Sequence, residues 1–132
     1  MTIMGVSAWR FVLGVIAAEA IPVLLLVLAM LPVGLIIGGR PSQETASAWG
    51  SWIGPIGGAL ATGFIAWMLG RASVRPMQLG VALGVAVGLV DLIWIASLGA
   101  PFRWVFVVSV LARVIGGSLG GVMAARSATP GG

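Results

Sequence analysis

Four apolar stretches, each long enough to cross a lipid bilayer, make up most of this sequence. They cover residues 11–37, 49–69, 77–98 and 102–125, and short connections join them. Hydrophobic residues are 60% of the chain and charged residues only 8%, whereas a soluble domain carries roughly 25% charged residues. Since the chain lacks the polar side chains that a water-exposed surface needs, we expect its solvent to be the lipid bilayer.

The fold class follows from what a backbone can do inside lipid. Every backbone polar group there needs an internal partner, which leaves helices or a closed barrel. Barrel strands alternate polar and apolar residues over about ten positions, but the apolar runs here are unbroken. We therefore predict an all-α integral membrane protein with four transmembrane helices in an up-down bundle. This single membrane domain is expected over 1–126, with a polar loop at 38–48 and a disordered tail at 127–132.

The arginines indicate the orientation of the helices. Four spans put both termini on one side, and cytoplasmic loops are enriched in positive charge. The termini side is expected to hold more arginines than the opposite side: Arg10, Arg71, Arg75 and Arg126 against Arg40 and Arg103. We expect a protein of the bacterial cytoplasmic membrane with both termini in the cytoplasm. Arginines scattered in this way mark topology and do not indicate a nucleic-acid partner.

A short internal repeat relates the second and fourth spans. Residues 56–63 read IGGALATG and residues 115–121 read IGGSLGG. The similarity predicts two tandem helical hairpins, or else it reflects chance matching between glycine-rich helices.

Glycines recur at helical spacing in three of the spans. Small residues four positions apart allow two helices to approach closely in a membrane. The stripes favour tight packing inside one bundle, or the binding of a second copy of the chain or of a larger membrane complex. The glycines predicted to pack helices are Gly54, Gly58, Gly80, Gly84, Gly88, Gly117, Gly120 and Gly121.

Three charged residues fall near the middle of the predicted spans. At a rise of about 1.5 Å per residue, Glu19, Asp91 and Arg113 lie about 15, 21 and 18 Å from the cytoplasmic ends of their helices. A charge at the bilayer centre costs roughly 2.5–3.5 kcal/mol on insertion scales, so each is a functional candidate. Asp91 and Arg113 lie at similar depth on consecutive antiparallel spans. We predict that they form a buried ion pair, either as a structural staple or as a gate.

Glu19 is predicted to lack a partner of its own, because Arg113 is assigned to Asp91. Burial away from water favours the neutral form of a carboxyl group, so Glu19 is a candidate proton or ion site. Two other arrangements stay open. A neutral Glu19 can bond to a backbone carbonyl that Pro22 leaves free, or Glu19 and Asp91 can share Arg113.

These residues resemble two kinds of membrane protein. The glycine patterns at 57–60 (GGAL), 80–88 (GVALGVAVG) and 116–121 (GGSLGG) resemble those of small glycine-rich four-helix bacterial membrane proteins of uncharacterised function. That likeness covers about residues 50–126 and implies no activity. The lone acid of the first span looks like the essential glutamate of small multidrug-resistance transporters, which exchange protons for cations as dimers. This second likeness is confined to Glu19, since Arg113 has no counterpart in that family.

The absence of Cys, His, Lys and Tyr narrows the choice of function. It removes the usual zinc ligands and most nucleophile-and-base sets, so we expect neither an enzyme nor a bound cofactor. The first remaining function is an accessory, scaffold or assembly subunit that packs through its glycine faces. The second is a minimal proton-coupled transporter or channel with Glu19 as the proton site. The scarcity of polar side chains in the spans favours the first.

Overall fold

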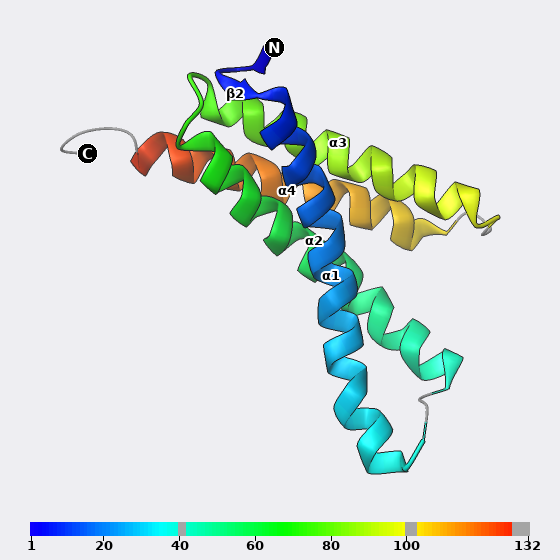
Figure 1. The fold of residues 1–132 in the computed structure, drawn as a ribbon. Coiled ribbons are helices and arrows are strands. Elements are labelled where there is room, and N and C mark those ends of the chain that lie inside the picture. The colour runs from blue at the N-terminus through cyan, green and yellow to red at the C-terminus, as the bar shows by residue number, and fades with distance from the viewer. Residues whose placement is uncertain (40–41, 100–102, 128–132) are drawn as a thin grey trace.

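The computed structural model describes residues 1–39, 42–99 and 103–127, and these residues form four long helices (Figure 1). The helices are α1 (Ala8–Ile37), α2 (Gln43–Gly70), α3 (Pro76–Ser97) and α4 (Trp104–Ser127). Each contains a segment long and apolar enough to cross a membrane. The predicted all-α, four-helix membrane fold is therefore confirmed. Of the predicted disordered tail, the described part is Ser127, which ends α4, and the rest lies outside the described residues.

A small β-hairpin precedes α1. Strands β1 (Thr2–Ile3) and β2 (Val6–Ser7) pair antiparallel, and the turn between them has positive φ at Met4 and Gly5. The Met4 carbonyl accepts hydrogen bonds from the hydroxyl of Ser73, at 2.6 Å, and from the Val74 amide, at 3.1 Å. The hairpin is thereby fixed to the connection between α2 and α3.

Helix α2 begins at Gln43, inside the segment that the sequence predicts as a loop. The Ser42 side chain accepts a hydrogen bond from the Thr45 amide at 3.1 Å, and Glu44 occupies the first turn. A serine N-cap and an early acidic residue both stabilise a helix start, so the helix extends beyond its apolar part. The membrane-crossing segment within it is Ala48–Gly70.

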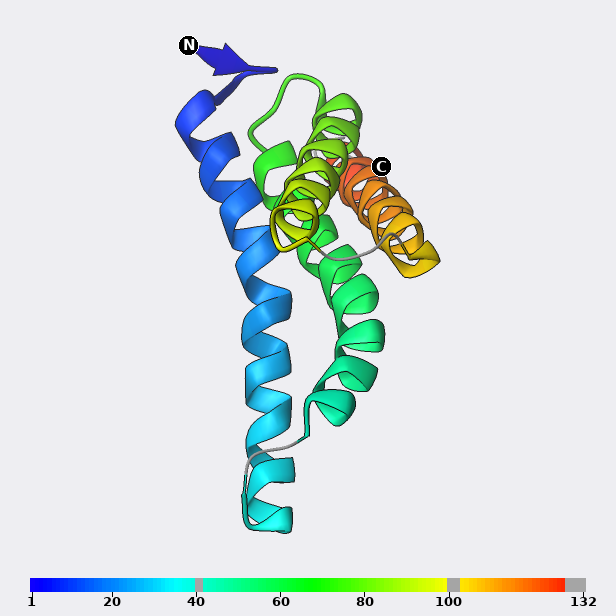
Figure 2. The ribbon, with the colours of Figure 1, turned by 90° about the vertical axis from the view of Figure 1, so that its right-hand side faces the viewer.

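The helices form two antiparallel hairpins, α1–α2 and α3–α4, that pack together at one end and diverge at the other. In Figure 1 the N-terminus and the α2–α3 connection lie at the upper left, whereas α1 and α2 run to the bottom and α3 and α4 to the right. Figure 2 shows the same divergence, with α1 and α2 extending well beyond α3 and α4. Helix α4 packs closely on α2 and α3, and α1 packs mainly on α2.

Two glycine faces of α4 allow this close packing at the converging end. The face made by Gly116 and Gly120 lies against the α2 backbone, and the face made by Gly117 and Gly121 lies against the α3 backbone. A Cβ atom on Gly84 of α3 would lie 2.7 Å from the Cα of Val114, so no side chain fits there. The glycine stripes of α2, α3 and α4 thus contact one another within the chain.

Gly54 does not follow this pattern. No neighbouring heavy atom lies within 4 Å of the position that its Cβ would take. The prediction that Gly54 packs helices together is therefore wrong within this chain, because Gly54 lies where the two hairpins have already separated.

The buried apolar core lies at the converging end, where α1, α2 and α3 meet. It contains Ala18, Ala66, Leu83 and Val87. Helix α1 continues unbroken through Pro22 and Pro32. The core positions the middle of α1 against the other helices, and the charged residues lie directly beyond it.

Candidate functional site

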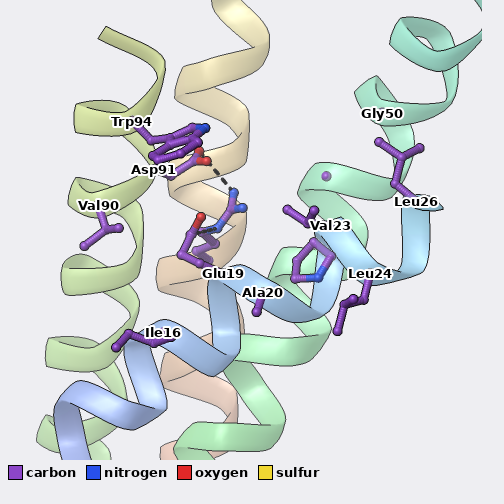
Figure 3. Close-up of a pocket in the computed structure, with 13 residues that line it drawn as sticks. Ile16, Glu19, Ala20, Val23, Leu24, Leu26, Gly50, Val90, Asp91 and Trp94 are labelled. Atoms are coloured by element: carbon purple, nitrogen blue, oxygen red, sulfur yellow. Dashed lines mark ion pairs between the residues drawn. The ribbon is translucent and has the colours of Figure 1, made fainter. Parts of the chain in front are cut away.

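Arg113 on α4 is the centre of a charged cluster that joins three helices. Its side chain is almost fully enclosed, with 3% of the residue exposed. Its Nε lies 3.2 Å from Oε1 of Glu19 on α1, and its Nη1 lies 3.4 Å from Oδ2 of Asp91 on α3 (Figure 3). The Nη1 group also donates a hydrogen bond to the hydroxyl of Ser109, one turn earlier on α4. We call Glu19, Asp91 and Arg113 the Arg113 cluster.

The cluster changes the interpretation of Glu19. The structure brings Asp91 and Arg113 together, as the sequence predicts, but Glu19 is not without a partner. Both acids share Arg113, which is the last of the three arrangements that the sequence left open. The reason lies in the packing, since α1 lies close enough to α4 at this level for Glu19 to reach Nε of Arg113 while Asp91 reaches Nη1.

Helix α2 contributes its backbone to the site. A Cβ atom on Gly58 would lie 2.7 Å from Cζ of Arg113, so the guanidinium occupies the space that a side chain would need. The Gly58 carbonyl accepts a hydrogen bond from the buried Thr62 hydroxyl at 2.6 Å. Gly58 was predicted to pack one helix against another, but its neighbour is a charged side chain.

The charges of the cluster do not cancel when all three groups are ionised. Two carboxylates then face one guanidinium, which leaves a net charge of −1. One bound proton or one monovalent cation would make the cluster neutral.

A cavity of about 660 Å³ lies beside the cluster, where the hairpins diverge. Its walls come from positions 16–26 of α1, Gly50 and Gly54 of α2, and positions 90–94 of α3. Apart from the Arg113 cluster these walls are almost entirely apolar. The side chains of Glu19 and Asp91 remain 23% and 15% exposed, so both carboxylates border open space while contacting Arg113.

A second cavity of about 270 Å³ lies between α2 and the α3–α4 hairpin. It shares Gly50, Gly54, Asp91 and Arg113 with the larger cavity, but its other walls differ. Ser51, Arg103 and Ser109 line it, which makes it more polar. The Asp91–Arg113 pair therefore borders both cavities, whereas Glu19 borders the larger one.

Sequence reasoning missed two residues of the site. Ser109 precedes Arg113 by one helical turn, and a hydroxyl at that spacing from a buried arginine is a signal that could have identified it. Trp94 lines the larger cavity beside Asp91 (Figure 3). Its spacing of three residues from Asp91 places the two side chains on one face of α3.

No group of three or more His, Cys, Asp or Glu side chains suited to a metal ion occurs in the part of the chain that the structure describes. The sequence matches no protein-family model, and searches of curated proteins and of solved structures give no significant match. The function therefore rests on the geometry of the site.

Proposed function

We propose that this chain is a small proton-coupled transporter, which exchanges one proton for a solute with a single positive charge at the Arg113 cluster. The observation that carries this proposal is the sharing of one guanidinium by two carboxylates at the inner end of a 660 Å³ apolar cavity. A structural staple needs one acid for one arginine. The second acid supplies a charge that a proton or a cation can balance.

The energetics favour exchange over independent binding. A net charge is costly in the membrane interior. The cluster is neutral, and therefore favoured, when it holds one proton or one cation. It is charged, and therefore disfavoured, when it holds neither or both. Entry of a cation then requires a proton to leave, and the reverse holds by thermodynamic reciprocity. Each cycle moves one proton against one positive charge.

The walls of the larger cavity indicate the chemical character of the uncharged part of the solute. Contact with apolar side chains favours an apolar body at about 25 cal/mol per Å² of buried surface. Trp94 adds an aromatic face close to Asp91, and aromatic rings attract cations that approach their faces. These features favour an organic cation over a hydrated metal ion.

The arginines indicate the orientation of the chain in the membrane. We place the chain in a bacterial cytoplasmic membrane with its termini in the cytoplasm, because the converging end carries more arginines than the diverging end. In this arrangement the diverging end of the hairpins faces away from the cytoplasm. Arg40, which entered the sequence-based count, lies outside the described residues.

A scaffold or assembly subunit has less support than the sequence suggested. The glycine stripes that favoured this function contact one another within the chain, which leaves fewer of them for a partner. Detection of a homo-oligomer or of a larger membrane complex, without transport, would favour the scaffold over the transporter.

The test is uptake by liposomes that contain the protein and hold an acidic interior. The solute panel contains quaternary alkylammonium ions, arylphosphonium ions and neutral lipophilic alcohols, with Glu19→Gln as the variant and Glu44→Gln as the control. Glu44 is a matched control because it is an exposed glutamate in the first turn of α2. We expect gradient-driven uptake of a cation by the wild type and by Glu44→Gln, and its loss in Glu19→Gln. Silence of all three proteins across the panel, together with a stable oligomer or a co-purifying protein, would support the scaffold instead.

A further inference from the structure

The two cavities meet at one pair of side chains. Asp91 and Arg113 line both of them, and Gly50 and Gly54 leave the α2 side of the junction without side chains. The ion pair, at 3.4 Å, therefore stands between a large compartment and a small one.

The small cavity has the properties of a water-filled space. Ser51, Ser109 and Arg103 provide polar groups along its walls. Its volume of about 270 Å³ accommodates several water molecules, each of which takes about 30 Å³ in the liquid. Buried water needs both room and two to four polar partners, and this cavity offers both.

The small cavity also leads toward one face of the membrane. Arg103 is exposed and directly precedes α4, at the diverging end of the α3–α4 hairpin. A charged side chain at a helix end extends to the aqueous interface. The cavity therefore connects Asp91 with the face of the membrane opposite the termini.

The large cavity opens in a different direction. Ile16 on α1 and Val90 on α3 line it (Figure 3), and both side chains are exposed in the chain. Helices α1 and α3 make few contacts with each other. This part of the wall is apolar and exposed, and in a bilayer an exposed apolar surface of this kind meets the hydrocarbon.

We propose that water reaches Asp91 through the small cavity from the face bearing Arg103, while the large cavity is filled from the lipid. Resting on the proposed function, this gives the proton and the solute separate routes that meet at Arg113. It also defines the solute class as organic cations that dissolve in the membrane before they bind.

Cysteine accessibility tests the two routes without transport. The natural chain contains no Cys, so each single-cysteine variant carries one reactive thiol, and only the water-exposed thiolate reacts quickly. Val105→Cys and Ile95→Cys report on the small cavity, and Val90→Cys reports on the large one. Leu119→Cys is the control for a lipid-facing position, and Val74→Cys marks the membrane face on the termini side, since both side chains are exposed. The probes are a charged, membrane-impermeant methanethiosulfonate and a lipid-soluble maleimide, applied to sealed vesicles from each side.

We expect Val105→Cys and Ile95→Cys to react with the charged reagent from the face opposite to that which labels Val74→Cys. Val90→Cys should behave as Leu119→Cys does, with at least tenfold slower charged labelling than Val105→Cys and ready labelling by the maleimide. Equal charged labelling of Val90→Cys and Val105→Cys would overturn the separate routes, as would labelling of both small-cavity thiols from the termini side. Absence of charged labelling at both small-cavity positions would overturn the proposal that water fills the small cavity. Failure of cation uptake together with the expected labelling pattern would reject the transporter but support the water-filled small cavity.

Discussion

Nε of Arg113 on α4 lies 3.2 Å from Oε1 of Glu19 on α1, although α1 packs mainly against α2. The first and last helices are thus joined chiefly through charge, while the glycine faces hold α2, α3 and α4 together. A change of charge at Glu19 therefore alters what holds α1 in place. Under the proposed function, this link would couple the charge state of Glu19 to the position of α1, which forms one wall of the larger cavity.

Removal of the shared cation should destabilise the protein. In Arg113→Gln the two carboxylates would face each other in the membrane interior without a counter-charge, and breaking a buried pair in this way costs about 3–5 kcal/mol. We expect a corresponding fall in the free energy of unfolding in detergent. The triple variant with Glu19→Gln and Asp91→Asn added should recover most of the loss. A triple variant no more stable than Arg113→Gln alone would contradict the cluster.

The close packing of α4 predicts that alanine substitutions at two glycines will have different effects on stability. Gly117→Ala places a Cβ against the Gly80 carbonyl, and overpacking of this kind costs about 1–3 kcal/mol. Gly54→Ala meets open space, and alanine is favoured over glycine in a helix by about 1 kcal/mol. Unfolding in detergent should therefore show a destabilised Gly117→Ala and a Gly54→Ala at least as stable as the wild type. Equal effects at the two positions would refute the assigned packing.

Substitution of Gly58 should reduce cation uptake more than it reduces the stability of the protein. A Cβ at position 58 would displace the guanidinium of Arg113, whose far end can move away, whereas a Cβ at Gly57 makes its nearest contact at an ordinary 3.6 Å. We expect Gly58→Ala to reduce cation uptake about tenfold, which corresponds to about 1.4 kcal/mol, with the protein still folded. Gly57→Ala is the matched control and should transport normally. Similar uptake by the two variants would show that the guanidinium position does not matter.

Ser109 should contribute through its hydrogen bond to Arg113. Ser109→Ala removes this acceptor but leaves Nη1 the Ser109 carbonyl and the Asp91 carboxylate, so we expect the loss of one hydrogen bond to a charged group, about 1.5–3 kcal/mol. Ser118 on the same helix donates to the carbonyl of Val114 within its own turn, so Ser118→Ala should cost less. Thermal unfolding of the two variants measures the difference, and a larger effect of Ser118→Ala would be the contrary result.

Hydrophobicity and charge spacing predicted the fold well, because a membrane constrains both strongly. The unbroken apolar runs require helices, and the sparse polar connections require hairpins. The start of α2 was less predictable, since capping by Ser42 extends the helix beyond its apolar part. Apolar runs report where a helix lies in lipid and not where its hydrogen bonds begin.

The sequence predicted which charged residues form the site, but it did not predict which of them contact one another. Depth along each helix placed Glu19, Asp91 and Arg113 near one level, which is a property of single helices. Whether Glu19 meets Arg113 depends on how α1 packs against the other helices, where Ala18 joins the buried core. The divergence of the hairpins, and with it both cavities, also arises from this packing and has no local signal in the sequence.

Proton release from the purified protein tests the exchange most directly. Tetraphenylphosphonium is added to detergent-solubilised protein in weakly buffered solution with a pH-sensitive dye, and its binding is measured in parallel by equilibrium dialysis. The account predicts about one proton released for each cation bound by the wild type, in line with the net charge of the cluster, and no release from Glu19→Gln. Binding without proton release, or release that persists when Glu19→Gln and Asp91→Asn are combined, would contradict it.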